Sequence, residues 1–149
     1  MKISTKGRYG LRALVDLALF SEGGHVSLAS IAERQDVSSI YLEQVFAILR
    51  KAGFVKSVKG AQGGYLLCEQ PKDIVIGRVL RVLEGDLLII DEVNPPDDNS
   101  QTIVYETIKE QVWDRINKEI IDMVDKLTLE DMVSYARQVT VESLPIYYI

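Results

Sequence analysis

Residues 37–65 constrain the fold of this chain more than any other stretch. They read VSSIYLEQVFAILRKAGFVKSVKGAQGGY, with apolar residues at helical spacing in the first half and several glycines in the second. The apolar positions of the first half form one stripe of a helix over residues 38–51: Leu42, Val45, Phe46 and Leu49. Polar residues lie on the other side of this helix, which leaves one face for contacts outside the core.

The second half of this stretch predicts a β-hairpin. Residues 54–58 alternate between two faces as a strand does, residues 59–64 form a loop with three glycines, and residues 65–68 form the return strand. The loop lacks the Gly-Lys-Ser/Thr ending of a nucleotide-binding loop, and no strand leads from it into a helix. A basic hairpin directly after a polar-faced helix favours a DNA-binding wing.

The segment before residue 37 supplies the first part of a helix-turn-helix. Ser27 can cap a short helix that ends near Asp36, and a tight turn then leads into the helix over residues 38–51. The first turn of such a second helix points its exposed side chains at base edges in the major groove. The fold class predicted is therefore mainly α with a small hairpin wing. The sequence alone leaves open that these polar side chains only solvate a helix face.

The first twenty residues predict another helix, which Ser4 or Thr5 caps and which ends at Phe20. Gly7 and Gly10 weaken its first turns intrinsically. We interpret them as points of close approach to another backbone, with a DNA phosphate as one option.

The rest of the chain divides into a short helix, a linker and a helical C-terminal part. Pro71 interrupts the chain, and a helix over residues 76–83 ends at Gly85. A last helix from Leu129 to Gln138 is capped by Thr128, and the tail from residue 139 is strand-like. We therefore expect a DNA-binding domain over 1–85, a linker or effector loop over 86–101, and a dimerisation part over 102–149.

A long helix over residues 100–127 dominates the C-terminal part. Its apolar residues recur at steps of three or four and form a stripe: Tyr105, Ile108, Val112, Ile116, Ile120, Met123 and Leu127. A domain of about 70 residues is too small to cover so long a stripe. We expect a second copy of the chain to cover it, and the alternative is a helix that folds back on its own domain.

The charge of the chain is unevenly distributed. Residues 1–70 hold nine Lys and Arg and six Asp and Glu, a balance of +3, whereas residues 71–149 hold eight and sixteen, a balance of −8. One half attracts phosphates and the other repels them, which would orient the protein on a duplex. No run approaches the roughly 18 apolar residues of a membrane helix. We expect a cytoplasmic protein with no membrane contact.

Several segments together resemble the Rrf-two family of bacterial transcriptional regulators. They are ISTKGRYGLRAL, the stretch from SLASIAERQDVSS to GGYLL, and IGRVLRVLEG. The compound motif YLEQ, LRKAG, VKG and GGYLL is far more specific than any one of its parts. The resemblance implies a homodimer in which the long helices pair and two winged domains bind double-stranded DNA at a palindromic operator.

The resemblance also implies roles for individual residues. The expected major-groove readers are Ser38, Ser39, Tyr41, Glu43 and Gln44. The basic, glycine-rich hairpin itself supplies the expected wing contacts Lys56, Lys59 and Gly60. Of these, Lys59 stands where many members have arginine. The expected backbone phosphate contacts are Lys2, Thr5 and Arg8.

One departure from the family pattern concerns the cofactor. Cluster-binding members carry three cysteines between the fourth helix and the long helix, and residues 86–101 contain none. The single cysteine, Cys68, lies in the wing's return strand. We therefore expect no iron–sulfur cluster, no metal and no other cofactor. The chain then looks most like a clusterless family member that represses cysteine metabolism with cysteine synthase as its partner enzyme.

Two further functions stay open from the sequence. The acidic half and the lysine in the wing are compatible with a winged module that binds proteins instead of DNA. Cys68 would allow a thiol redox sensor if it is exposed. An enzyme finds little support, because the chain has one histidine, one cysteine and no recognisable nucleophile–base pair.

Overall fold

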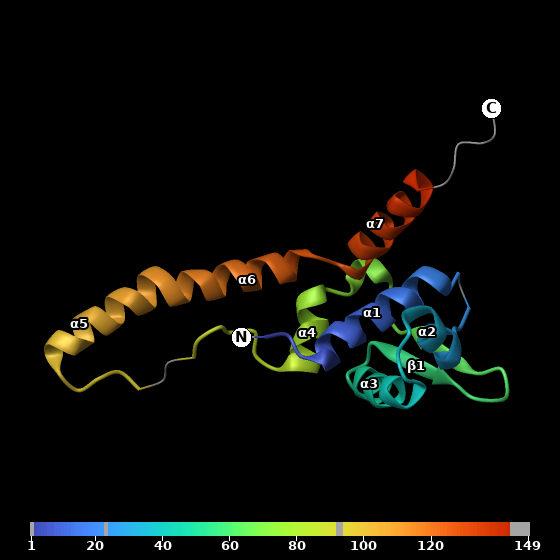
Figure 1. Cartoon of the computed structure of the whole chain (residues 1–149), viewed down its shortest axis with the longest axis horizontal. Coiled ribbons are helices and arrows are strands. Elements are labelled where there is room, and N and C mark those ends of the chain that lie inside the picture. Colours follow the sequence, from blue (N-terminus) through green and yellow to red (C-terminus); the bar gives the residue numbers. More distant parts are fainter. Residues whose placement is uncertain (1, 23, 92–93, 144–149) are drawn as a thin grey trace.

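The computed structural model describes residues 2–22, 24–91 and 94–143. A compact winged unit is formed by the N-terminal elements, and a long helical rod extends away from it (Figure 1). The elements follow in the order α1 (Thr5–Phe20), α2 (Leu28–Gln35), α3 (Ser39–Lys51), β1 (Val55–Val58), β2 (Gly64–Leu67), η1 (Pro71–Asp73), α4 (Ile76–Glu84), α5 (Asn99–Ile108), η2 (Lys109–Trp113), α6 (Asp114–Lys126) and α7 (Leu129–Glu142). In the part of the chain that the structure describes, no helix is long and apolar enough to cross a bilayer.

Polar caps start α1, α2 and α7 where the sequence predicted them. The hydroxyl of Ser4 accepts from the backbone N–H of Gly7 at 3.3 Å, and Ser27 caps α2 in the same way. Thr128 and Asp131 form a reciprocal capping box at the start of α7. Each cap satisfies a backbone N–H that the first helical turn leaves without a partner.

One main hydrophobic core joins the helices of the winged unit to the hairpin. The predicted stripe of α3 is buried in it, and α7 contributes Leu129 and Val133. Its largest fully buried side chains come from α1, α2, α3 and the strand entry: Phe46, Phe54, Leu14, Leu17, Ile31, Leu42 and Leu49. The C-terminal helix therefore packs on the same core as the N-terminal helices.

The two glycines of α1 approach α4 and not another backbone or a phosphate. A Cβ atom at Gly7 would lie 2.1 Å from Glu84 Oε1, and one at Gly10 would lie 2.6 Å from Leu83 Cδ1. Both positions are buried against these side chains. The interpretation of the glycines as phosphate or backbone contacts was wrong, because the close neighbour is the end of α4.

The hairpin is antiparallel and is fixed to the loop before α2. β1 pairs with β2 from Val55 opposite Leu67 to Val58 opposite Gly64, so the return strand begins one residue earlier than predicted. Val26 and Tyr65 exchange two backbone hydrogen bonds of 3.0 and 2.8 Å. The wing is thereby held against the body of the winged unit.

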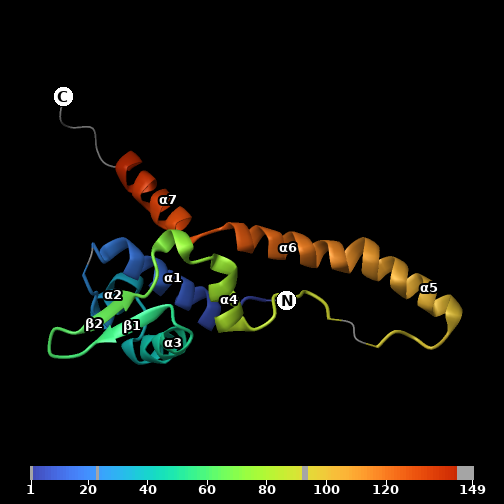
Figure 2. The same cartoon turned by 180° about the vertical axis from the view of Figure 1, so that it is seen from behind.

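The rod is one uninterrupted helical run from Asn99 to Lys126, close to the predicted extent (Figure 2). Its middle, η2, is a π-helical turn that the sequence pattern did not predict. No described residue of α5 is buried within this chain.

The segment between α4 and α5 is partly packed. Leu87 is buried in a second apolar cluster with Ile76, Leu80 and Val124. The buried amide of Asn117 accepts from Ile89 N and donates to Ile90 O, at 2.8 and 3.1 Å. The first part of the predicted linker is thus attached to α6.

The chain returns to the winged unit after the rod. Ile76 N donates to Leu127 O and Leu129 N donates to Ile74 O, both at 2.8 Å. α7 then continues to Glu142, so the strand-like reading of residues 139–142 was wrong. Helical hydrogen bonding from the preceding turns outweighs the β-propensity of these valines. The rest of the predicted tail, residues 144–149, lies outside the described residues.

Candidate nucleic-acid interface

The exposed face of α3 begins at its first turn. Ser39, Glu43 and Gln44 are exposed, as predicted for base-reading side chains. The hydroxyl of Ser38 accepts from Tyr41 N at 3.3 Å and so caps the helix. A capped helix N-terminus with free polar side chains can enter the major groove and also meet a phosphate.

Tyr41 is placed differently from the other predicted readers. Its ring is half-buried and lies edge-on to Tyr9 of α1, with ring centroids 6.1 Å apart at 88°. The guanidinium of Arg12 lies 5.0 Å from the Tyr9 ring centre and also donates to Gln35 O. This contact between α1 and α3 was missed, because Tyr9 fitted the helical apolar spacing and gave no sign of its partner.

A shallow groove of about 550 Å³ lies between α3 and the hairpin. Its lining brings Glu43 and the cations Arg50 and Lys59 to one place, together with Gly60. Lys56 does not line this groove, although it is exposed on β1. Arg50 was not among the predicted contacts, although its place on the polar side of the helix could have indicated it.

Glycines shape the hairpin next to this groove. Gly60 has φ of +115°, a region that side-chain-bearing residues rarely adopt. A Cβ atom at Gly64 would lie 2.3 Å from Val26 O, so only glycine permits the bridge that holds the wing. The rings of Phe46 and Tyr65 lie 4.7 Å apart and set the wing against α3.

The start of α1 carries a separate set of polar groups. Lys2, Thr5 and Arg8 are exposed, and Arg8 Nη2 donates to Thr5 Oγ1 at 3.4 Å. None of these three lines the groove between α3 and the wing. They stay predicted phosphate contacts.

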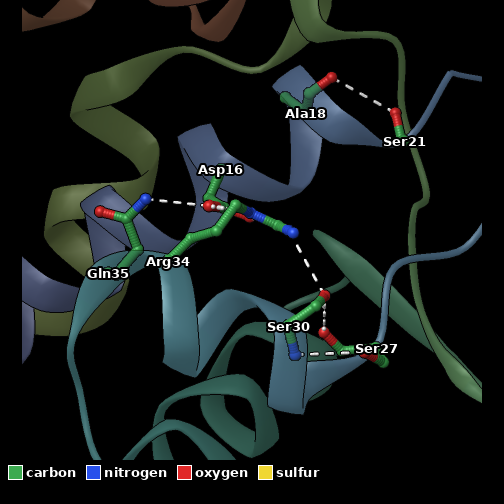
Figure 3. A network of polar contacts seen from close by, with 7 residues as sticks. All are labelled: Asp16, Ala18, Ser21, Ser27, Ser30, Arg34 and Gln35. Carbon is green, nitrogen blue, oxygen red and sulfur yellow. Dashed lines mark hydrogen bonds and ion pairs between the residues drawn. The ribbon is translucent and has the colours of Figure 1, made fainter.

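An ion pair between a buried carboxylate and a partly exposed arginine fixes α2 against α1 (Figure 3). Arg34 donates to both oxygens of Asp16 at 2.9 and 2.8 Å, and Gln35 Nε2 donates to Asp16 Oδ2 at 2.8 Å. The Asp16 side chain is fully shielded from water. The hydrogen bond to Asp16 raises the pKa of Arg34 despite some desolvation. α2 is the first helix of the helix-turn-helix and α3 is the second. This network therefore holds the first helix of the helix-turn-helix against α1.

The predicted dimerisation stripe is largely open on the rod. Ile108, Val112, Ile116 and Met123 are 40, 38, 38 and 57% exposed, and Tyr105 and Ile120 are half-buried. Leu127 differs, because it packs on the second apolar cluster of its own chain. Two strongly exposed residues of α5, Ile103 and Val104, were missed because neither falls on the stripe. Val104 flanks it, and Ile103 lies on nearly the opposite side of the helix.

The donor groups of the chain do not fit an iron–sulfur cluster. Such clusters take cysteine thiolates, with histidine in some cases. The sequence has one cysteine and one histidine, and Cys68 is exposed just after β2. Within residues 2–22, 24–91 and 94–143, no group of three His, Cys, Asp or Glu side chains is arranged to hold a metal ion.

Comparison with known proteins gives consistent matches along most of the chain. A model of the Rrf2 (Rrf-two) family, described as an iron-dependent transcriptional regulator, matches residues 3–135. The transcriptional regulator CymR of Bacillus subtilis (strain 168) is 44% identical over 135 residues, which is 91% of each chain.

Solved structures give the same picture. The structure of CymR, the global cysteine regulator of B. subtilis, has a TM-score of 0.78 and 41% identity, covering 91% of this chain and 98% of that one. T. potens IscR has a TM-score of 0.75 and 44% identity, covering 99% and 97%. Both are similar to this chain in the winged unit and in the rod.

Proposed function

Because the chain belongs to the Rrf2 family of transcriptional regulators, we propose that it is a repressor that binds a palindromic DNA operator as a homodimer. The observation that carries the proposal is the capped, exposed first turn of α3, next to a groove lined by Arg50 of α3 and Lys59 of the wing. Helix dipole and cations together favour phosphate contact, and the polar side chains of α3 can read base edges. Such a regulator acts in the cytoplasm and is not an enzyme.

The dimeric state is proposed from the rod. Its exposed apolar residues would remain in water in a single chain, and a second copy offers the same stripe for pairing. Two winged units related by a two-fold axis match a palindromic operator.

The proposal holds that the regulator works without an iron–sulfur cluster. The number of possible ligands supports this, since the one cysteine of the chain cannot supply the several thiolates that usually hold an iron–sulfur cluster. Iron and sulfide analysis of protein purified without oxygen tests the point, and stoichiometric iron with sulfide would overturn it.

Control of cysteine or sulfur metabolism is the proposed regulatory role. It rests on the similarity to CymR, which is a global cysteine regulator in B. subtilis. Cysteine synthase is the proposed partner enzyme, on the family resemblance alone. A pull-down with and without its acetylserine substrate tests this partner.

Titration of DNA by fluorescence anisotropy tests the central proposal. Lys59→Ala should weaken binding to all sequences alike and reduce the salt dependence by about one phosphate contact. Glu43→Ala should alter base preference, because a carboxylate can accept from a cytosine amino group. Unchanged affinity, salt slope and preference in both variants would contradict the proposed contacts.

A thiol sensor is the second candidate, and the exposure of Cys68 at the end of the wing favours it. Blocking this thiol should then change DNA affinity, and Cys68→Ser should be insensitive to the reagent. If instead the protein ignores duplex DNA at low salt but captures a protein partner, the winged unit is an interaction module.

A further inference from the structure

Ile40 lies in the first turn of α3 and is 71% exposed. This is the largest exposed fraction among the large apolar side chains that the structure describes as exposed. Leaving an isoleucine in water forgoes the free energy that burial would provide. The sequence pattern gave no role to this residue, because it falls outside the buried stripe.

The surroundings of Ile40 separate it from the other exposed apolar residues. Most of those lie outside the winged unit's DNA-facing helix, on the rod that carries the proposed dimer stripe and on α7. Within the winged unit, Phe20 is 49% exposed and one face of its ring is stacked by the guanidinium of Arg34 at 4.2 Å, and Val82 is 37% exposed. Ile40 is more exposed than Phe20 and Val82, and it lies on the face of α3 that is proposed to enter the major groove.

The helical spacing places Ile40 among the base-reading side chains. Glu43, Gln44 and Ala47 follow it at steps of three, four and seven, which is one face of a helix. All four are exposed. The isoleucine side chain is branched at Cβ and keeps one strongly preferred χ1 rotamer in a helix. Its methyl groups are therefore presented in a fixed direction.

We propose that Ile40 reads the 5-methyl group of a thymine in the major groove of the operator. This inference rests on the proposed DNA-binding function and deepens it. Thymine alone among the standard DNA bases carries a methyl group in that groove, and apolar side chains contact it there. Ile40 thus makes each half-site require a thymine next to the bases read by Glu43 and Gln44.

Replacement of single thymines by uracil isolates the methyl group, because base pairing is unchanged. A duplex selected from random sequences by the protein serves as the probe, and its Kd is measured by anisotropy at one salt concentration. In one half-site, a single thymine-to-uracil change should weaken wild-type binding about fourfold, as expected for losing one buried methyl group.

Ile40→Ala tests whether this side chain makes the contact. The variant should bind the thymine duplex more weakly and should no longer distinguish it from the uracil duplex. Its fold is preserved, because the side chain is exposed and alanine favours helix. Val82→Ala, an apolar truncation on α4, should keep the full thymine preference.

Each result bears on the inference. If the wild type binds the duplex but no thymine is sensitive, or if Ile40→Ala keeps the same thymine preference, the Ile40 contact is overturned while the DNA-binding function stands. If the wild type does not bind duplex DNA, both fall.

Discussion

Asp16 shows how one side chain can position a helix-turn-helix that it does not belong to. It lies on α1 and takes three hydrogen bonds from Arg34 and Gln35 of α2. A carboxylate without exposed surface depends on such partners, because water cannot solvate its charge. The start of the helix-turn-helix is thereby tied to α1.

Asp16→Asn should destabilise the fold by about 3 kcal/mol. This value is near the lower end of the range for breaking a buried ion pair, because Arg34 keeps contact with water. Urea unfolding followed by circular dichroism measures this change. Asp122→Asn, which breaks an exposed pair with Lys118 on α6, is the control and should cost less than about 1 kcal/mol. Equal effects of the two substitutions would contradict the structural role of Asp16.

Gly64 is constrained by the bridge to Val26. Gly64→Ala would place Cβ 2.3 Å from Val26 O, so the bridge must separate and the wing must move. We expect a loss of about 1–3 kcal/mol together with weaker DNA binding. Gly24→Ala is the matched control, since its nearest contact is an ordinary 3.6 Å. This control should have the melting temperature and the DNA affinity of the wild type, as measured by thermal unfolding and by anisotropy.

At the scale of elements, the contact between the start of α1 and the end of α4 is sensitive to pH. Burial of the Glu84 carboxyl opposes its ionised form, but hydrogen bonds from Ser4 and Gly7 prevail and lower its pKa. A carboxyl whose pKa is lower when folded stabilises the fold above its unfolded pKa, and this stabilisation is lost as the pH falls.

The stability of the wild type should therefore decline as the pH drops below about 4.3, the ordinary pKa of a glutamate, and continue to decline through the lower folded pKa. Glu84→Gln should be less stable than the wild type at neutral pH and should lose less stability on acidification. Urea midpoints across this pH range measure the effect. The control Glu110→Gln, at an exposed position of η2, should show the same dependence of stability on pH as the wild type. If Glu84→Gln also shows the wild-type dependence on pH, the contact of Glu84 with the start of α1 is not its cause.

The elements that depend on local chemistry were predicted from the sequence. Thr128 predicted the start of α7, and Ser27 predicted the start of α2, because caps involve residues within one turn. The end of α7 was mispredicted, since β-branched valines suggested a strand and the helix continued through them. The π-helical turn has no signature in the apolar spacing.

Contacts between distant elements limited the prediction of the site. The exposed face of α3 followed from its apolar stripe, so the exposure of Glu43 and Gln44 was predicted. The burial of Tyr41 against Tyr9 depends on how α1 crosses α3, and periodicity does not contain that information. The same holds for Asn117, whose partners lie more than 25 residues away.

At the scale of the whole molecule, α3 and the hairpin lie on one side of the winged unit and α7 on the other (Figure 1). The rod leaves this unit sideways, and the Arg81–Asp125 ion pair at 2.8 Å holds its base to α4. The proposed DNA-binding surface and the proposed dimer surface are therefore separate parts of the chain.

Ile116→Glu should convert the proposed dimer to monomer, because an unpaired carboxylate would be buried between two apolar stripes. Sedimentation velocity measures the mass. Affinity for a palindromic duplex should fall about 100-fold through loss of bivalent binding, while half-site affinity is retained. Glu106→Gln, about 200° around the helix from Ile108, is the control. A dimeric Ile116→Glu protein would contradict the pairing of the rods.

In the proposed dimer, the π-helical turn in the rod would affect the rotational phase between the two half-sites. Such a turn closes its hydrogen bonds over five residues where an α-helix uses four. Each residue added to or removed from a helix rotates everything beyond it by about 100°. A single insertion or deletion near Lys109–Trp113 would thus change the orientation of one winged unit relative to the winged unit of the second copy. Such a change in the rod would alter the preferred spacing between the two proposed half-sites without substitution of any proposed base-contacting side chain.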